Sequence, residues 1–172
     1  LSDILFYDNL FHEYSSNWFI KEIKHLWNRT LKRIDLTSRS LVTLIEPGSC
    51  FGGFLSEIIF ASDRSYMAEG IFENSNDPEA KITLSKSNFN FFKMSNDITR
   101  LETRFLNETE KIKELESKIL TELDSQMALD MGLVTFSFDD IDWEDEVRIF
   151  LEERSSFSPD SMTGLEANLR FA

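Results

Sequence analysis

One segment constrains the fold more than any other, residues 41–63, which read LVTLIEPGSCFGGFLSEIIFASD. Its apolar beginning, 41–46, is typical of a short strand buried on both faces. Pro47 and Gly48 interrupt this run. A second apolar pattern then follows with helical spacing and predicts a helix at 52–62. Strand, glycine-bearing turn and helix in this order predict an α/β unit.

The turn between this strand and this helix suits an anion. A helix N-terminus carries N–H donors without intrahelical acceptors and a partial positive charge. Gly52 and Gly53 also let another group approach the backbone closely. Such a turn can bind a phosphate or hold a developing oxyanion. A turn that merely packs a helix against a strand would use the same glycines, so this alternative stays open.

The neighbouring residues exclude the familiar glycine motifs. A phosphate-binding loop needs Lys after its second glycine, and this chain has Phe54 there. The dinucleotide fingerprint G-x-G-x-x-G is absent. The hydrolase elbow G-x-S-x-G is absent too, because Ser49 directly follows Gly48. Oxyanion stabilisation is therefore the favoured chemistry.

The remaining sequence predicts further elements of the same α/β unit and no repeats. An amphipathic helix is predicted at 14–34 with Ser15 or Ser16 as its cap. A strand at 64–68 is predicted to run parallel to 41–46. The other predictions are a turn at 74–78, a strand at 81–92, a helix capped within 95–97 that ends at 105, a helix at 107–131, a strand or extended arm at 133–138, a helix at 142–154 and a last helix capped by Ser158.

Composition and charge limit the class of protein. The chain of 172 residues is 41% hydrophobic, which fits one domain with its own core. Its net charge of −13 argues against a nucleic-acid surface. No run of eighteen apolar residues is present, so no membrane span is expected. The one cysteine, Cys50, excludes an internal disulfide and fits a reducing compartment, hence a cytoplasmic location.

The sequence shows no pattern typical of a metal site or of a catalytic nucleophile. His12 and His25 have no Cys or acid in metal-ligand register. The acids within 139–146 match no calcium loop. We therefore predict no metal and no cofactor, and no Ser-His-Asp or Cys-His pairing. Cys50 lies in the turn beside the predicted helix N-terminus, and the alternative for it is a small buried side chain.

The segment EPGSCFGGFLSEIIFASDRSYM resembles the glycine-rich turn of the enoyl-CoA hydratase/isomerase (crotonase) superfamily. More narrowly, it is similar to the benzoyl-CoA-dihydrodiol lyases, as are LKRIDLTSRSLVTLIEPGSC and ALDMGLVTFSFDDIDWEDEVRIFLEERSSFSPDSMTGLEANLRF. This resemblance spans nearly the whole chain. It implies an α/β fold with crotonase-like repeated ββα units, in which helices pack on a small, mainly parallel sheet. Residues 1–172 would form part of one acyl-CoA-binding domain.

The resemblance also implies catalytic roles in the turn. Gly53 aligns with the residue whose N–H usually completes the oxyanion hole for a thioester carbonyl. Ser49 is the preferred polar catalytic residue, as a donor or a water-orienting group. Glu57 corresponds to the acid of the hydratases, although it lies one position later, and Phe54 replaces a third glycine. The residues implied to bind substrate are Cys50, Phe51 and Gly52.

The implied reaction is hydrolytic ring opening of 2,3-epoxybenzoyl-CoA to 3,4-didehydroadipyl-CoA semialdehyde and formate. An oxyanion hole would stabilise the charge that develops on the thioester oxygen. One alternative is another enzyme of the enoyl-CoA hydratase/isomerase type. The other is a non-catalytic module that keeps acyl-CoA or subunit contacts, which Phe54 and the shifted Glu57 favour.

The expected partners are an acyl-CoA thioester and further copies of the chain in a homo-oligomer, with no nucleic acid and no membrane. The chain starts without Met and stops in a predicted helix, so we expect it to be a later piece of a longer chain. We expect this piece alone to be inactive and only marginally stable, because a parallel sheet without its neighbouring strands exposes its edges.

Overall fold

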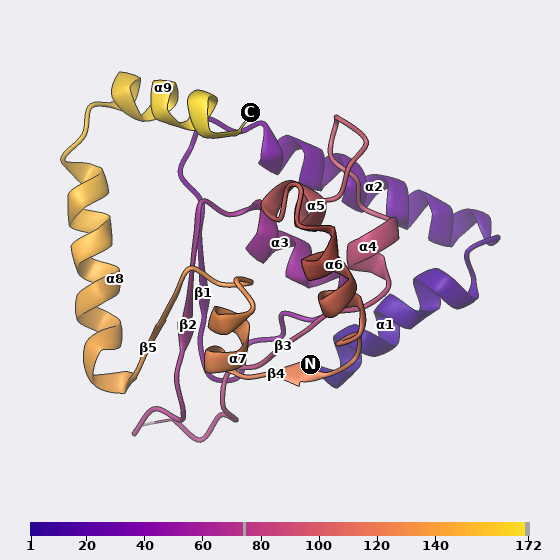
Figure 1. Ribbon diagram of the computed structural model, residues 1–172, viewed down its shortest axis with the longest axis horizontal. Coiled ribbons are helices and arrows are strands. Elements are labelled where there is room, and N and C mark those ends of the chain that lie inside the picture. The colour runs from indigo at the N-terminus through magenta and orange to yellow at the C-terminus, as the bar shows by residue number, and fades with distance from the viewer. Residues whose placement is uncertain (74, 171–172) are drawn as a thin grey trace.

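The computed structural model describes residues 1–73 and 75–170 and is built around a parallel sheet (Figure 1). Its strands are β1 (Val42–Ile45), β2 (Arg64–Ala68) and β5 (Phe136–Phe138), in the order β1-β2-β5. Both pairings are parallel, which confirms the predicted parallel pair of strands. A second, antiparallel pair joins β3 (Ile82–Thr83) to β4 (Glu122–Leu123). These two strands have two residues each, and Thr83 of β3 forms an isolated parallel bridge with Gly52 in the turn that follows β1.

Helices cover both sides of the parallel sheet. The 3₁₀-helix η1 and the short helix α3 follow the turn, and α1 and α2 pack against them. Helix α8 stands against β5 on the other side, and α9 crosses the upper end in Figure 1. The helices are α1 (Ser2–Glu13), α2 (Trp18–Asp35), η1 (Gly53–Leu55), α3 (Ser56–Ala61), α4 (Ser87–Asn90), α5 (Arg100–Arg104), α6 (Thr109–Glu116), α7 (Ser125–Asp130), α8 (Asp140–Ser155) and α9 (Pro159–Arg170).

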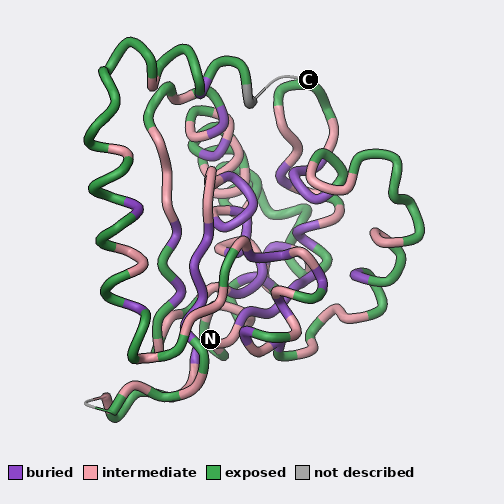
Figure 2. The backbone as a smooth tube through the Cα atoms, turned by 60° about the vertical axis from the view of Figure 1, so that its left-hand side comes forward, coloured by how far each residue is buried: buried purple, intermediate pink, exposed green. Residues whose placement is uncertain are grey.

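Two apolar clusters hold these layers together. The larger one lies between the sheet and the helices and includes Ile45, Ile59 and Met67, all of which are fully buried. The smaller one joins α1, α2 and the segment after α4 through Phe11, Leu31 and Phe92. Figure 2 shows the buried segments gathered at the centre, whereas the outer helix at its left is mostly exposed. The turn after β1 lies where the two clusters meet, because Phe51 packs on the first and Phe54 on the second.

Several predicted elements are confirmed. The strands at 41–46 and 64–68 are present within one residue of their predicted ends. The predicted last helix is α9, and the Ser158 hydroxyl accepts the Ser161 N–H at 3.2 Å. The predicted helix at 142–154 is α8, which begins slightly earlier because Asp139 caps it. Among the described residues, no helix combines the length and the apolar character that a membrane span requires.

The helix predicted at 107–131 is wrong. The segment was predicted as one helix because its apolar residues continue at helical spacing. Leu115 and Leu123 are indeed both buried in the larger cluster. The backbone nevertheless breaks after α6, where Leu120 has a φ of +62°. Asp124 then accepts the Met127 N–H at 2.8 Å and starts α7 as a separate helix. Gly132 follows α7 with a φ of +71°.

The strand predicted at 81–92 is also wrong beyond β3. The Asn88 side chain accepts the Ser85 N–H at 2.9 Å, and the Ser85 hydroxyl accepts the Ser87 N–H at 3.0 Å. These local hydrogen bonds compete with a strand ladder and turn the chain into α4. Ile82, Leu84 and Phe92 of this segment are buried, and Phe89 and Phe91 are partly buried.

Two helix starts differ from their predictions. Asn17 caps α2 in place of Ser15 or Ser16, because its side chain accepts the Phe19 N–H at 2.9 Å. Thr99 caps α5 in place of a residue within 95–97. Helix α1 was not predicted. The turn predicted at 74–78 includes residue 74, which lies outside the described residues.

Candidate functional site

The turn after β1 is shaped by short-range hydrogen bonds. The Ser49 N–H donates to the Glu46 carbonyl at 3.0 Å, and the Ser49 hydroxyl accepts the Glu46 N–H at 3.0 Å. Gly48 has a φ of +79°, which glycine adopts without strain. Its N–H donates to the Pro78 carbonyl at 2.9 Å. The Ser49 hydroxyl oxygen is thus already an acceptor within the turn and retains its proton as a donor.

Both glycines at the end of the turn lie against side chains of the N-terminal segment that contains α1. A Cβ at Gly52 would lie 2.7 Å from Leu1 Cδ1, and a Cβ at Gly53 would lie 2.6 Å from the carboxyl carbon of Asp8. Gly53 also has a φ of +52°. The close approach that the glycines permit is therefore made by the chain's own first helix, and in particular by a carboxyl group.

Asp8 places an anion at the start of the helical segment. Its Oδ1 accepts the Phe54 N–H at 2.9 Å, and the side chain is buried with 3% of its surface exposed. This is the arrangement expected of an anion at N–H groups that have no intrahelical acceptor. The sequence indicated that the turn suits an anion but gave no sign of Asp8, because α1 was not predicted.

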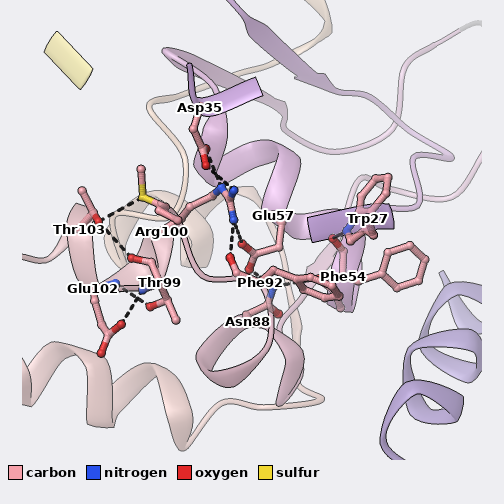
Figure 3. Close-up of polar contacts among 12 residues, drawn as sticks. Trp27, Asp35, Phe54, Glu57, Asn88, Phe92, Thr99, Arg100, Glu102 and Thr103 are labelled. Atoms are coloured by element: carbon pink, nitrogen blue, oxygen red, sulfur yellow. Dashed lines mark hydrogen bonds and ion pairs between the residues drawn. The ribbon is translucent and has the colours of Figure 1, made fainter. Parts of the chain in front are cut away.

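Glu57 points away from solvent into a buried polar network (Figure 3). The side chain is 1% exposed. Its Oε1 accepts Asn88 Nδ2 at 2.8 Å and its Oε2 accepts Arg100 Nη1 at 2.8 Å. Asn88 Nδ2 also donates to the Gly53 carbonyl at 2.9 Å. The network therefore connects the glycine turn to Arg100 through two side chains.

Arg100 is the centre of this network. Its Nε and Nη2 donate to the two carboxylate oxygens of Asp35 at 2.9 and 2.6 Å, a bidentate ion pair. Its Nη1 also donates to the Phe92 carbonyl at 2.6 Å. One buried guanidinium thus faces two buried carboxylates, those of Asp35 and Glu57.

This imbalance of charge sets the ionisation of Glu57. The pKa of Glu57 is raised from 4.5 to about 7, mainly by burial and to a smaller extent by the Asp35 carboxylate. The charge of Arg100 and the hydrogen bonds from Asn88 and Arg100 act in the opposite direction. Because Arg100 already balances Asp35, a protonated Glu57 leaves the network neutral.

The other predicted site residues lie along the turn itself. Cys50 is exposed, so the alternative of a small buried side chain is wrong. Phe51 is partly buried, and its carbonyl accepts the Thr83 N–H at 3.2 Å. Gly52 forms an isolated parallel bridge with Thr83. The structure therefore brings 49–53 together by chain continuity, whereas Glu57 faces the buried network one helical turn further on.

A cluster that sequence spacing did not predict lies beside the turn. His12 Nε2 is 3.1 Å from Ser87 Oγ and 4.0 Å from Asp8 Oδ2. Both contacts use the same ring nitrogen, so this is not the relay of a catalytic triad, which needs one nitrogen for each neighbour. Burial lowers the pKa of His12, Asp8 opposes this shift, and Lys24 and Lys86 add to it. Among residues 1–73 and 75–170, no group of His, Cys, Asp and Glu is arranged to hold a metal ion.

The parallel sheet, the glycine turn and the packed helices form the crotonase fold. An enoyl-CoA hydratase from Bacillus anthracis superimposes with a TM-score of 0.64 over 88% of this chain and 54% of its own, at 16% identity. An enoyl-CoA hydratase from Bacillus halodurans gives a TM-score of 0.63 over 88% of this chain and 55% of its own, at 16% identity. The predicted crotonase-like α/β fold is confirmed. No protein-family model matches the chain.

A comparison of amino-acid sequences points to one kind of enzyme within the crotonase superfamily. The chain is 48% identical over 157 residues to the benzoyl-CoA-dihydrodiol lyase of Aromatoleum evansii. The match covers 90% of this chain and 27% of that protein, so the chain spans about a quarter of the length of this relative. The resemblance to benzoyl-CoA-dihydrodiol lyase within the crotonase superfamily, predicted from the turn and its flanking segments, is confirmed.

Proposed function

We propose that this chain is part of an enzyme that opens the ring of 2,3-epoxybenzoyl-CoA with water, releasing formate and 3,4-didehydroadipyl-CoA semialdehyde. The observation that carries this proposal is the 48% identity over 157 residues to a benzoyl-CoA-dihydrodiol lyase. The crotonase fold, shared with enoyl-CoA hydratases, supports an acyl-CoA thioester as the substrate class. The proposed setting is the cytoplasm, and the proposed assembly is a homo-oligomer.

Within this proposal, residues 1–172 contribute part of one acyl-CoA-binding domain. The Gly53 N–H polarises the thioester carbonyl, Ser49 donates to the substrate or orients water, and Glu57 transfers a proton. The remaining substrate contacts are assigned to Cys50, Phe51 and Gly52. The exposure of Cys50 and the free proton of the Ser49 hydroxyl support these roles. A Glu57 with a pKa of about 7 is also suited to gaining and losing a proton near neutral pH.

A second candidate function is favoured by Asp8. Its carboxylate already accepts the Phe54 N–H, and it lies where a side chain at Gly53 would project. Glu57 has both oxygens engaged by Asn88 and Arg100. In this candidate the segment is a non-catalytic crotonase-like module that supports the fold of the larger enzyme and takes no part in the chemistry.

Formate release from 2,3-epoxybenzoyl-CoA, measured on the full-length enzyme, tests the proposal. Calorimetric titration with benzoyl-CoA tests binding. Ser49→Ala removes a hydroxyl from the turn, and Ser117→Ala removes one from an exposed site at the end of α6 as the matched control. If the turn acts in catalysis, Ser49→Ala lowers kcat about tenfold or more, whereas Ser117→Ala leaves it unchanged.

Two further results would distinguish the ring-opening enzyme from the non-catalytic module. Turnover that neither Ser49→Ala nor Asp8→Asn alters would favour the non-catalytic module. Absence of both turnover and benzoyl-CoA binding in the native full-length protein would overturn the ring-opening proposal itself. Proline at Gly53 is unsuitable for this purpose, because the φ of +52° is incompatible with the proline ring.

A further inference from the structure

A cavity of about 630 Å³ lies at the end of the sheet opposite the glycine turn. The turn follows the carboxyl end of β1, whereas the cavity is lined by Asp63 and Arg64 at the start of β2. Because β1 and β2 are parallel, the turn and the cavity lie at opposite ends of these strands. The far wall comes from the end of α8, from Phe157 and from α9. A cavity of this volume is in the range of small-molecule sites.

Four arginines line this cavity, in a chain whose net charge is −13. They are Arg64, Arg100, Arg104 and Arg154. Arg100 is balanced by Asp35 and Glu57. Within the part of the chain that the structure describes, none of the other three arginines has a carboxylate within 4.0 Å. An acidic chain thus leaves three guanidinium groups without an ion pair around one cavity.

Two of these guanidinium groups are held by one aromatic ring. The guanidinium carbon of Arg64 lies 4.8 Å from the centroid of Phe150, and that of Arg154 lies 5.4 Å from the same centroid. Stacking on a ring fixes the plane of each group and leaves its edge N–H donors available. Both groups carry a positive charge, and an anion in contact with both would be stabilised by them.

Arg104 supplies the third donor. Its Nε donates to the Gly132 carbonyl at 2.6 Å, which fixes the side chain and leaves the two terminal nitrogens for another acceptor. Burial lowers the pKa of the Arg104 guanidinium, a shift that a bound anion would oppose. All three arginines are half-buried, so their donors are shielded from bulk water but accessible from the cavity.

The acids at the cavity do not take the place of a ligand. Asp63 accepts the Leu41 N–H and has further interactions of its own. Glu153 is exposed on α8. Neither forms an ion pair with Arg64, Arg104 or Arg154 among the described residues. The rest of the wall includes apolar side chains, those of Phe60, Met94 and Phe157.

We propose that this cavity binds a small phosphorylated ligand, with its phosphate among Arg64, Arg104 and Arg154 and an aromatic or apolar body against Phe60, Met94 and Phe157. Guanidinium forks match the geometry of phosphate oxygens, and a dianion balances more than one guanidinium. A carboxylate has only one charge and two oxygens, so it engages fewer of these donors. The site is independent of the proposed thioester chemistry at the turn.

Calorimetric titration of the protein with phenyl phosphate, inorganic phosphate and benzoate tests this proposal. Phenyl phosphate is expected to bind with the highest affinity, inorganic phosphate to compete with it, and benzoate to bind about tenfold or more weakly. Arg154→Gln and Arg104→Gln should each weaken phenyl phosphate about tenfold. Arg148→Gln is the matched control, because Arg148 lies on the same helix as Arg154 but pairs with Asp145 and Glu152 outside the cavity.

Circular dichroism confirms that each variant is folded before its affinity is compared. Loss of affinity in both Arg154→Gln and Arg104→Gln, with native affinity in Arg148→Gln, supports the site. The proposal is overturned if the native protein shows no saturable binding of phenyl phosphate at millimolar concentration. It is equally overturned if the three variants lose affinity alike, since that would be an effect of net charge.

Discussion

At the scale of single residues, Gly53 and Gly70 have similar backbones and different surroundings. Their φ angles are +52° and +73°. A Cβ at Gly70 would have no atom within 4 Å, whereas a Cβ at Gly53 would lie 2.6 Å from the Asp8 carboxyl carbon. The two positions therefore separate the cost of backbone strain from the cost of displacing Asp8.

We predict that Gly53→Ala lowers the free energy of unfolding by about 1–2 kcal/mol more than Gly70→Ala. Both variants incur the strain of an L-residue at positive φ, about 1 kcal/mol. Only Gly53→Ala must also move Asp8 and weaken its hydrogen bond from the Phe54 N–H. Chemical denaturation of both variants measures the difference. Adding Asp8→Ala should remove most of the excess, and equal losses in the two glycine variants would contradict the prediction.

Sequence could identify the glycines of the site but not the reason for them. The spacing around Gly52 and Gly53 predicted a turn suited to an anion. It could not predict that the anion is a carboxylate of the same chain, because α1 has a mixed apolar pattern and no side-chain cap. Nor could it show that Glu57 is buried, since that depends on Asn88 and Arg100, which come much later in the chain.

At the scale of elements, α5 is a short helix that carries Arg100 into the network. Thr99 and Glu102 form a capping box: the Thr99 hydroxyl accepts the Glu102 N–H at 3.1 Å, and the Glu102 carboxylate accepts the Thr99 N–H at 2.6 Å. A helix of five residues gains little from propagation, so its start depends strongly on such caps.

We predict that Thr99→Ala lowers the free energy of unfolding by about 1 kcal/mol or more, because it removes the cap of α5. Thr99→Ser keeps the hydroxyl and should retain most of that stability. Thr109→Ala is the control, since Thr109 is exposed in the first turn of α6, where the capping position makes no side-chain hydrogen bond. Thermal unfolding of the three variants is the measurement. An equal effect of Thr99→Ala and Thr109→Ala would show that the capping box is not important.

Element by element, apolar periodicity predicted burial better than it predicted secondary structure. In 107–131, Ile112, Leu115, Leu123 and Met127 all pack in the larger apolar cluster, yet the segment is two helices and a strand. The segment 81–92, predicted as a strand, is the short strand β3 followed by the helix α4. Periodicity reports which face is buried. Asp124 and Asn88 decide where the helices start, through hydrogen bonds to the backbone that no periodicity contains.

At the scale of the whole molecule, the buried network joins four helices. Asp35 ends α2, Glu57 lies in α3, Asn88 in α4 and Arg100 in α5. Arg100 is 2% exposed, so its ion pairs are largely shielded from water. Removing one member of such a network leaves the others as buried charges without a counter-ion, which costs more than the ion pair itself contributes.

We predict that Arg100→Met lowers the free energy of unfolding by about 3–5 kcal/mol, because it removes the guanidinium that neutralises the buried Asp35 carboxylate and donates to Glu57. Arg29→Met is the matched control on α2. Arg29 is exposed, so its loss should change stability by less than about 0.5 kcal/mol. Urea denaturation measures both. A loss below about 1 kcal/mol for Arg100→Met would mean that the network contributes little to the fold.

The same network should make stability depend on pH through Glu57. Its pKa is about 7 in the folded protein, above the ordinary value of 4.5. Between these two values the unfolded chain has lost the Glu57 proton while the folded protein retains it. The folded state therefore binds one proton more than the unfolded state in this window. Its free energy of unfolding should fall as the pH rises from about 4.5 to about 7, by an amount on the order of 3 kcal/mol.

Glu57→Gln should abolish this part of the pH dependence. Glutamine does not titrate, and Arg100 remains balanced by the bidentate pair with Asp35. Urea unfolding at several pH values between about 5 and about 8 compares this variant with the native protein. Glu110→Gln, at an exposed position of α6, should keep the native slope. If the native protein and Glu57→Gln lose stability in parallel as the pH rises, Glu57 is ionised in the folded state throughout, and the network carries a net negative charge at neutral pH.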